Sequence, residues 1–255
     1  MNRKIFLAGA SGVIGRRLGP LLVAADYEVF GTTRSEAKAA ELEAAGVKPI
    51  VVDVFDGPTL SLVMTTVQPD IVMHQLTDLS LGLEPTHMAE AIGRNARIRI
   101  QGTKNLVAAA LVAGTGRIIA QSIAWAYAPG ARPYSESDDL DLDAEGTRAI
   151  SVRGVATLER LITTSQPLEG AVLRYGQLYG PGTGNVKPAG SAPLHVDAAA
   201  QAALLAGNEE QRAFSTLLKT TGLCRLKRPG KNWAGIPAFA SQPRSSRKCL
   251  KGKIN

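Results

Sequence analysis

The chain has 255 residues, enough to bury the core of one large domain or of one domain with a small lobe. Its net charge of +7 is uneven: residues 212–255 hold 11 Lys/Arg and no Asp/Glu, whereas residues 1–211 hold 18 basic and 22 acidic side chains. No run reaches the roughly 20 apolar residues of a membrane span, and the first apolar strand leaves no room for a signal peptide, so we expect a cytoplasmic protein without membrane contact. Cys224 and Cys249 lack the spacing of metal ligands, so we expect no metal.

A buried strand followed at once by a glycine-rich turn opens the chain. Residues 5–8 form the short apolar run of a central parallel strand, and three glycines follow with the spacing G-x-x-G-x-x-G. In a dinucleotide-binding turn such glycines permit the tight turn, the approach of a pyrophosphate and close helix packing, and the helix beginning near residue 13 offers its N–H groups to the phosphates. An ordinary α/β turn is the alternative, but the neighbouring strands and helix favour nucleotide binding. The predicted contacts are Gly9, Ser11, Gly12, Val13, Ile14 and Gly15.

The second predicted strand, residues 27–32, ends in a way that favours NADP. An acidic residue at this point usually binds the ribose 2′-hydroxyl of NAD, but this chain has Thr33, Arg34 and Ser35. An arginine beside small hydroxyl residues can hold a 2′-phosphate, so we predict NADP, with NAD as the alternative. Arg34 can also be a solvated residue at the start of the next helix.

Strands and helices alternate along the rest of the chain. Further strands are predicted at residues 48–53, 70–74, 117–121 and 170–175, and helices at 13–25, 35–45, 57–67, 86–112, 147–164 and 198–206. This alternation predicts an α/β fold with a doubly wound parallel sheet of the Rossmann type. Asp53 ends the third strand, where it can contact the adenine or cap the next turn. His74 ends the fourth strand and is interpreted as structural.

Two turns complete the predicted crevice. Residues 128–146 are rich in Pro, Ser and Asp and are predicted to form a surface loop over it. Pro181, in a Gly-Pro-Gly turn after the sixth strand, is expected on the nicotinamide side. Asp197 is the predicted N-cap of the last helix.

Several motifs, in this order, resemble the NAD-dependent epimerase/dehydratase family, the extended short-chain dehydrogenases/reductases. They are the glycine triplet, Asp53, residues 102–106, Arg174 with residues 178–182, and residues 195–197. The resemblance covers residues 4–206. It implies a Rossmann domain that binds NAD(P) and an oxidoreductase acting on a sugar nucleotide or another small carbonyl or alcohol. It also implies that two long helices can pair subunits into a homodimer.

The acid/base pair implied by this resemblance is absent. Active members use Tyr-x-x-x-Lys, in which the lysine lowers the pKa of the tyrosine so that the phenolate exchanges a proton with the substrate. Anchored on Glu159, the two positions fall on Ser151 and Val155. No tyrosine in the chain has a lysine four residues later.

The remaining candidates for chemistry are hydroxyl residues. Ser122 is the first candidate, with Tyr127 and Ser151 as weaker ones, although Ser122 can equally satisfy backbone groups. Counting back from Tyr127, the family's serine position falls on Ile123. The family's helical asparagine aligns nearer Arg99, and Asn95 is a substitute one turn earlier.

The carboxyl-terminal part departs from the family. Only residues 183–193 separate the Gly-Pro-Gly turn from residues 195–197, so we predict a reduced substrate lobe within a Rossmann domain of residues 1–211. The basic tail, residues 212–255, is predicted to be poorly ordered, or not the family's native terminus because of a shifted reading frame. It contains no recognised nucleic-acid-binding module, so a nucleic-acid partner is not expected. The alternative to a weak oxidoreductase is a non-catalytic NADP-binding regulatory module.

Overall fold

The computed structural model of the protein describes residues 2–78, 87–190 and 192–208. Its centre is a six-stranded parallel sheet in the order β3-β2-β1-β4-β5-β6. The strands are β1 (Lys4–Ala8), β2 (Glu28–Thr33), β3 (Lys48–Val51), β4 (Ile71–His74), β5 (Arg117–Ile123) and β6 (Glu169–Tyr175). β1 pairs with both β2 and β4, so the strand order reverses beside it, which is where ligands bind in open α/β sheets. The predicted doubly wound parallel sheet is confirmed.

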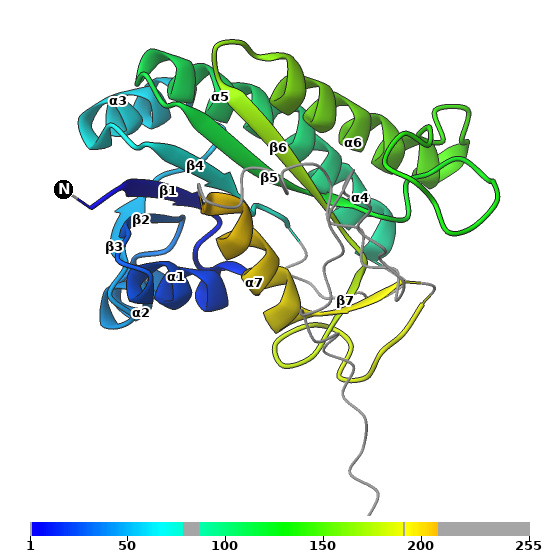
Figure 1. The fold of residues 1–255 in the computed structure, drawn as a ribbon, viewed down its shortest axis with the longest axis horizontal. Helices are drawn as coiled ribbons and strands as arrows, with labels where there is room; N and C mark the ends of the chain where they lie inside the picture. The colour runs from blue at the N-terminus through cyan, green and yellow to red at the C-terminus, as the bar shows by residue number, and fades with distance from the viewer. Residues whose placement is uncertain (1, 79–86, 191, 209–255) are drawn as a thin grey trace, which may run out of the picture. The chain divides into compact units, whose positions relative to one another are not determined.

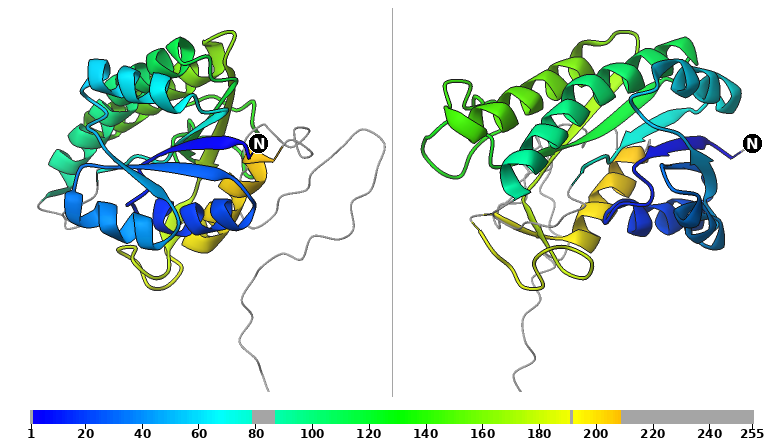
Figure 2. Two further views of the ribbon diagram at one scale, coloured as in Figure 1. Left: turned by 90° about the vertical axis from the view of Figure 1, so that its left-hand side faces the viewer. Right: turned by 180° about the vertical axis from the view of Figure 1, so that it is seen from behind.

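Helices cover both faces of this sheet (Figures 1 and 2). One layer holds α1 (Gly15–Ala24), α2 (Glu36–Ala44) and α7 (Val196–Gly207); the other holds α3 (Gly57–Val67), α4 (Met88–Arg97), α5 (Thr103–Val112) and α6 (Gly146–Thr164). Successive residues of a strand point to opposite faces, so Ile5 and Leu7 join one apolar cluster while Phe6 and Ala8 join the other. This burial on both faces explains the uninterrupted apolar run of β1.

The long helix predicted at residues 86–112 is interrupted by a π-helical turn, η2 (Ile98–Gly102), between α4 and α5. Its predicted first residue lies outside the described part of the chain. A Cβ on Gly102 would lie 3.3 Å from Val54 Cγ1, so the glycine lets η2 pack closely on the segment after β3.

A two-stranded parallel sheet, β7 (Gln177–Tyr179) with β8 (Pro193–His195), precedes α7. The predicted N-cap Asp197 was wrong. The helix begins two residues earlier than expected, and its N-cap is His195, whose Nδ1 accepts a 3.3 Å hydrogen bond from the Asp197 N–H. The predictions for residues 212–255 fall outside the described residues. Over the part of the chain that is described, no helix has both the length and the apolar character needed to span a bilayer.

Candidate functional site

The glycine-rich turn after β1 has no room for side chains at two of its three glycines. Gly9 has a φ of +87°, and a Cβ on it would lie 2.8 Å from the backbone of Gln75. A Cβ on Gly15 would lie 2.2 Å from the Gly9 carbonyl oxygen. The Gly9 N–H donates to Thr32 Oγ1 at 3.1 Å, which ties the turn to β2. The turn is therefore fixed by its backbone and by one threonine.

The helix that follows this turn presents an uncapped amino terminus. Its N-cap, Ile14, makes no side-chain cap, and its first turn contains no acidic residue. The first N–H groups of a helix need acceptors, and the dipole there attracts negative charge. The predicted residues Ser11, Gly12 and Val13 surround this end and are partly buried. The tight glycine cradle and the uncapped helix end fit the diphosphate of a dinucleotide.

Arg34 and Asp53 leave the sheet at the same end, because β2 and β3 pair in parallel with Thr33 opposite Val51. The Arg34 side chain is 60% exposed, and its Nη2 lies 3.9 Å from Asp78 Oδ2. Asp53 is exposed, and its Oδ1 accepts a 2.9 Å hydrogen bond from the Phe55 N–H, so it caps a turn as one of its two interpretations expected. That bond leaves its other carboxylate oxygen available to a ligand.

Arg17 joins the glycine-rich turn to two segments far along the chain, the turn after β7 and the start of α7. Its guanidinium donates to Val13 O at 2.9 Å, to Pro181 O at 2.5 Å and to Asp197 Oδ1 at 2.6 Å. The predicted contact Pro181 is thereby brought to the first turn of α1. Sequence reasoning missed Arg17, because two of its partners lie 164 and 180 residues away and no local pattern marks such contacts.

Ser122 and Tyr127 come together, but around a buried ion pair. Ser122 Oγ donates to Glu159 Oε1 at 2.7 Å. Arg174 donates to the same carboxylate through Nε at 2.9 Å and Nη2 at 2.6 Å. The Glu159 side chain is 12% exposed and the Arg174 side chain 7%. The Arg174 guanidinium lies 4.7 Å from the centre of the Tyr127 ring. The Ser122 hydroxyl thus binds a carboxylate of α6, which neither sequence interpretation had foreseen.

All three predicted hydroxyl residues are buried. Burial raises the pKa of Tyr127, even though Arg174 acts in the opposite direction, so the phenol keeps its proton at neutral pH. Ser151 is 4% exposed and Val155 is fully buried. The two positions of the Tyr-x-x-x-Lys pair therefore carry no titrating group.

The other polar residues that the sequence singled out, His74 and Asn95, lie at the end of β4 and on α4. His74 is fully buried, with Nε2 3.1 Å from Thr103 Oγ1, and its Nδ1 accepts from the Leu76 N–H at 3.3 Å. Burial, with a smaller contribution from the Arg99 charge, lowers the pKa of His74 to about 4, so the ring is neutral. The Asn95 side-chain amide holds the backbone of Asp78: Asn95 Oδ1 accepts from the Asp78 N–H at 3.0 Å, and Asn95 Nδ2 donates to the Asp78 carbonyl oxygen at 3.0 Å. These two bonds fix the backbone after β4.

The sequence profile of the NAD dependent epimerase/dehydratase family matches residues 5–215. The chain belongs to this family. Within the family it keeps the backbone cradle of the fold and lacks the tyrosine–lysine pair. In the described residues no group of three His, Cys, Asp or Glu side chains could hold a metal ion.

Two curated relatives differ in their named activities. A 3-diazoavenalumate denitrifying reductase from a Streptomyces species is 41% identical over 191 residues, covering 74% of this chain and 60% of the relative. A UDP-N-acetyl-alpha-D-glucosaminuronate decarboxylase from Bacillus cytotoxicus is 27% identical over 207 residues, covering 79% and 62%. The chain therefore spans about three fifths of the length of these relatives.

Solved structures share the fold at low sequence identity. The Bordetella bronchiseptica enzyme WbmH in complex with NAD+ has a TM-score of 0.65 at 18% identity, with 84% of this chain and 74% of that chain covered. A UDP-glucose 4-epimerase from Thermotoga maritima has a TM-score of 0.64 at 18% identity, with 80% and 73% covered. These structures establish the Rossmann fold of the epimerase/dehydratase family for this chain.

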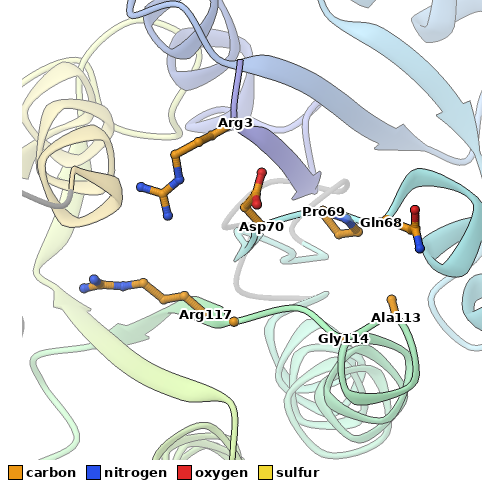
Figure 3. A pocket seen from close by; sticks show the side chains of 8 residues that line it. Arg3, Gln68, Pro69, Asp70, Ala113, Gly114 and Arg117 are labelled. Carbon is orange, nitrogen blue, oxygen red and sulfur yellow. The ribbon is translucent and has the colours of Figure 1, made fainter. Parts of the chain in front are cut away.

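A hollow of about 500 Å³ lies at the end of the sheet opposite the glycine-rich turn (Figure 3). Its lining includes Arg3, Asp70 and Arg117, which stand at the amino ends of β1, β4 and β5. Arg3 and Arg117 extend in the same direction on either side of Asp70. Ligands of open α/β sheets bind at the carboxyl ends of the strands, so this hollow is separate from the cofactor cradle.

Proposed function

We propose that the protein is an NADPH-preferring reductase that needs no proton from a tyrosine. The observation that carries this proposal is the contrast between the glycine cradle, whose backbone fits a diphosphate, and the α6 positions that hold serine and valine in place of the tyrosine–lysine pair. The main chain of residues 9–15 would hold the diphosphate, and Pro181 would border the nicotinamide. When bound, the reduced nicotinamide supplies a hydride.

The acceptor that suits such a site is one that takes up hydride without a proton. Reduction of a carbonyl needs both, whereas reductive loss of N2 from a diazonium carbon needs only hydride, because a C–H bond replaces the C–N bond and N2 departs unprotonated. The relative that is 41% identical is named for the denitrifying reduction of a diazo compound that is itself an anion. A small anionic diazo compound is therefore the acceptor that we propose.

The preference for NADPH depends on Arg34. Its guanidinium is mostly exposed and comes no closer than 3.9 Å to the carboxylate of Asp78, so it has donors available to a 2′-phosphate. Asp78, that carboxylate, also lies 3.6 Å from Arg94 Nε, which offsets its repulsion of an incoming phosphate. No acidic side chain occupies residues 32–35 to select the 2′-hydroxyl of NAD.

The test is oxidation of NADPH and of NADH with a carboxyl-substituted arenediazonium salt and with a matched aromatic aldehyde. We expect turnover of the diazonium salt, with the arene as product and less than a tenth of that rate for the aldehyde. Reactions without protein and with heat-inactivated protein correct for spontaneous decomposition. Turnover of the aldehyde alone, or binding of neither reduced cofactor at millimolar concentration, contradicts the proposal.

Arg34→Ala tests the cofactor preference directly. Removing one exposed charge–phosphate contact should raise the KM for NADPH about tenfold and leave the KM for NADH within about twofold. Arg160→Ala, which removes an exposed arginine from α6, is the matched control. Equal effects of Arg34→Ala on both cofactors would exclude a 2′-phosphate contact.

The buried ion pair also favours a second candidate, a non-catalytic NADP-binding module. Ser122 is committed to Glu159, and a protein that only binds the cofactor needs no reactive hydroxyl. Saturable NADPH binding without turnover of either acceptor supports this candidate. Turnover abolished by Ser122→Ala counts against it, whereas our reductase proposal expects Ser122→Ala to retain most of the activity.

A further inference from the structure

Arg99 lies in the π-helical turn η2, and among the described residues its charge has no partner of opposite sign. The residue is partly buried. Within residues 2–78, 87–190 and 192–208 its guanidinium makes no hydrogen bond or ion pair, and burial alone lowers its pKa, to about 10. At neutral pH it is still a cation. Single π turns inside helices are frequent at functional sites, because they redirect the side chains they carry.

The position of Arg99 follows from its contacts with α6. A Cβ built on Gly154 would lie 3.2 Å from Ala96 Cα and 3.6 Å from Arg99 Cδ. The glycine therefore lets α6 pack closely against α4 and η2, and the aliphatic part of the Arg99 side chain lies beside Gly154. The next residue is Val155, where the family resemblance places the catalytic lysine. Arg99 also influences the pKa of His74 at the carboxyl end of β4. The cation therefore lies toward the catalytic end of the crevice, beside the place that relatives fill with lysine.

Other arginines around the crevice have carboxylate partners. Arg17 binds Asp197 at 2.6 Å, Arg174 binds Glu159 at 2.6 Å and Arg94 binds Glu90 at 2.5 Å. The Arg99 guanidinium is only partly buried, so its N–H groups remain accessible to a ligand, and neutral His74 offers it no opposite charge. A planar fork of N–H donors without a partner is suited to a carboxylate, which it can bind through two parallel hydrogen bonds.

We propose that Arg99 binds the carboxylate of the substrate and so makes the enzyme selective for acidic acceptors. The family's lysine on α6 would thus be replaced, in this chain, by an arginine in η2 that binds the substrate and does not lower the pKa of a tyrosine. This inference rests on the proposed reductase function, which supplies the acceptor. It requires the substrate to approach between η2 and α6.

Binding of a matched pair of ligands tests this without depending on turnover. The full chain, saturated with NADPH, is titrated calorimetrically with cinnamate and with cinnamamide, which differ in charge but have nearly the same shape. We expect cinnamate to bind at least tenfold more tightly to the wild type. Arg99→Gln should reduce this preference to within twofold, Arg99→Lys should keep part of it, and NADPH affinity should stay within twofold in both variants.

The controls distinguish a failure of this inference from a failure of the proposed reductase function. Arg160→Gln, at an exposed position of α6, should keep the full preference, and thermal melting of each variant verifies folding; Arg99→Lys serves if Arg99→Gln fails to fold. Equal or undetectable binding of the two ligands to the wild type overturns the inference. A loss of NADPH affinity in Arg99→Gln with the cinnamate preference intact also overturns it, because Arg99 would then serve the cofactor. Selective cinnamate binding without any turnover would refute the reductase function alone.

Discussion

The two halves of the sheet differ in how much of the family's machinery they keep. In β1–α1–β2 the proposed cofactor site depends on the main chain, on two glycines that admit no Cβ and on an uncapped helix end. In β5–α6–β6 the family's acid/base positions depend on side chains, and there a serine and a valine occupy them while Ser122 is held by a buried ion pair. Main-chain geometry tolerates almost no substitution, whereas side-chain chemistry can be exchanged while the packing persists. Under our proposal, one fold keeps the cofactor cradle while the acid/base pair is lost.

The largest expected effect comes from adding a side chain to the cradle. Gly15→Val should weaken NADPH binding by at least about 1,000-fold, roughly 4 kcal/mol, because its Cβ would lie 2.2 Å from one carbonyl oxygen and 2.6 Å from another and the turn must open. Fluorescence titration measures this. The control is Gly93→Ala, whose new Cβ meets nothing within 4 Å. An affinity close to wild type in Gly15→Val would mean that the cradle does not hold the cofactor.

A break in the other half should affect stability and leave cofactor binding intact. Glu159→Ala leaves the Arg174 charge buried without its bidentate partner, which we expect to lower the free energy of unfolding by about 3 kcal/mol. NADPH affinity, measured on the folded fraction, should stay within twofold. Glu41→Ala, which breaks a 3.9 Å surface contact with Arg16, is the control and should cost less than about 0.5 kcal/mol. A comparable loss in both variants would show that the ion pair contributes little.

A smaller effect is expected from pH at the junction of the two halves. The pKa of buried His74 is about 4 in the folded protein against 6.5 in the unfolded chain, so only the unfolded chain binds the proton in this range. The contribution to stability is present above pH 6.5 and is lost as the pH falls toward 4, by about 2 kcal/mol between pH 7 and pH 5. His74→Gln cannot titrate and keeps an amide donor for Thr103. Denaturant unfolding at the two pH values should therefore give a smaller acid loss for His74→Gln than for the wild type, and equal losses would refute the assignment.

The elements of the fold were predictable because their signals are local. The apolar run of β1, the glycine spacing and the alternation of strands and helices each lie within a few residues, and the structure confirms the sheet that they predict. The site was less predictable, because its contacts join distant segments. Arg17 reaches Pro181 across 164 residues, and Ser122 meets Glu159 across 37. The π turn at η2 also has no local signal.

Arg17 gives the crevice a wall that exists before any ligand arrives. Its three hydrogen bonds fix Val13, Pro181 and Asp197 relative to one another, so a cofactor bound as we propose does not have to order the turn after β7. Binding free energy that would otherwise compensate the lost chain entropy stays available as affinity. A preorganised wall of this kind is compatible with the reduced substrate lobe that we predict from the sequence, because few further residues are then needed to complete the binding surface.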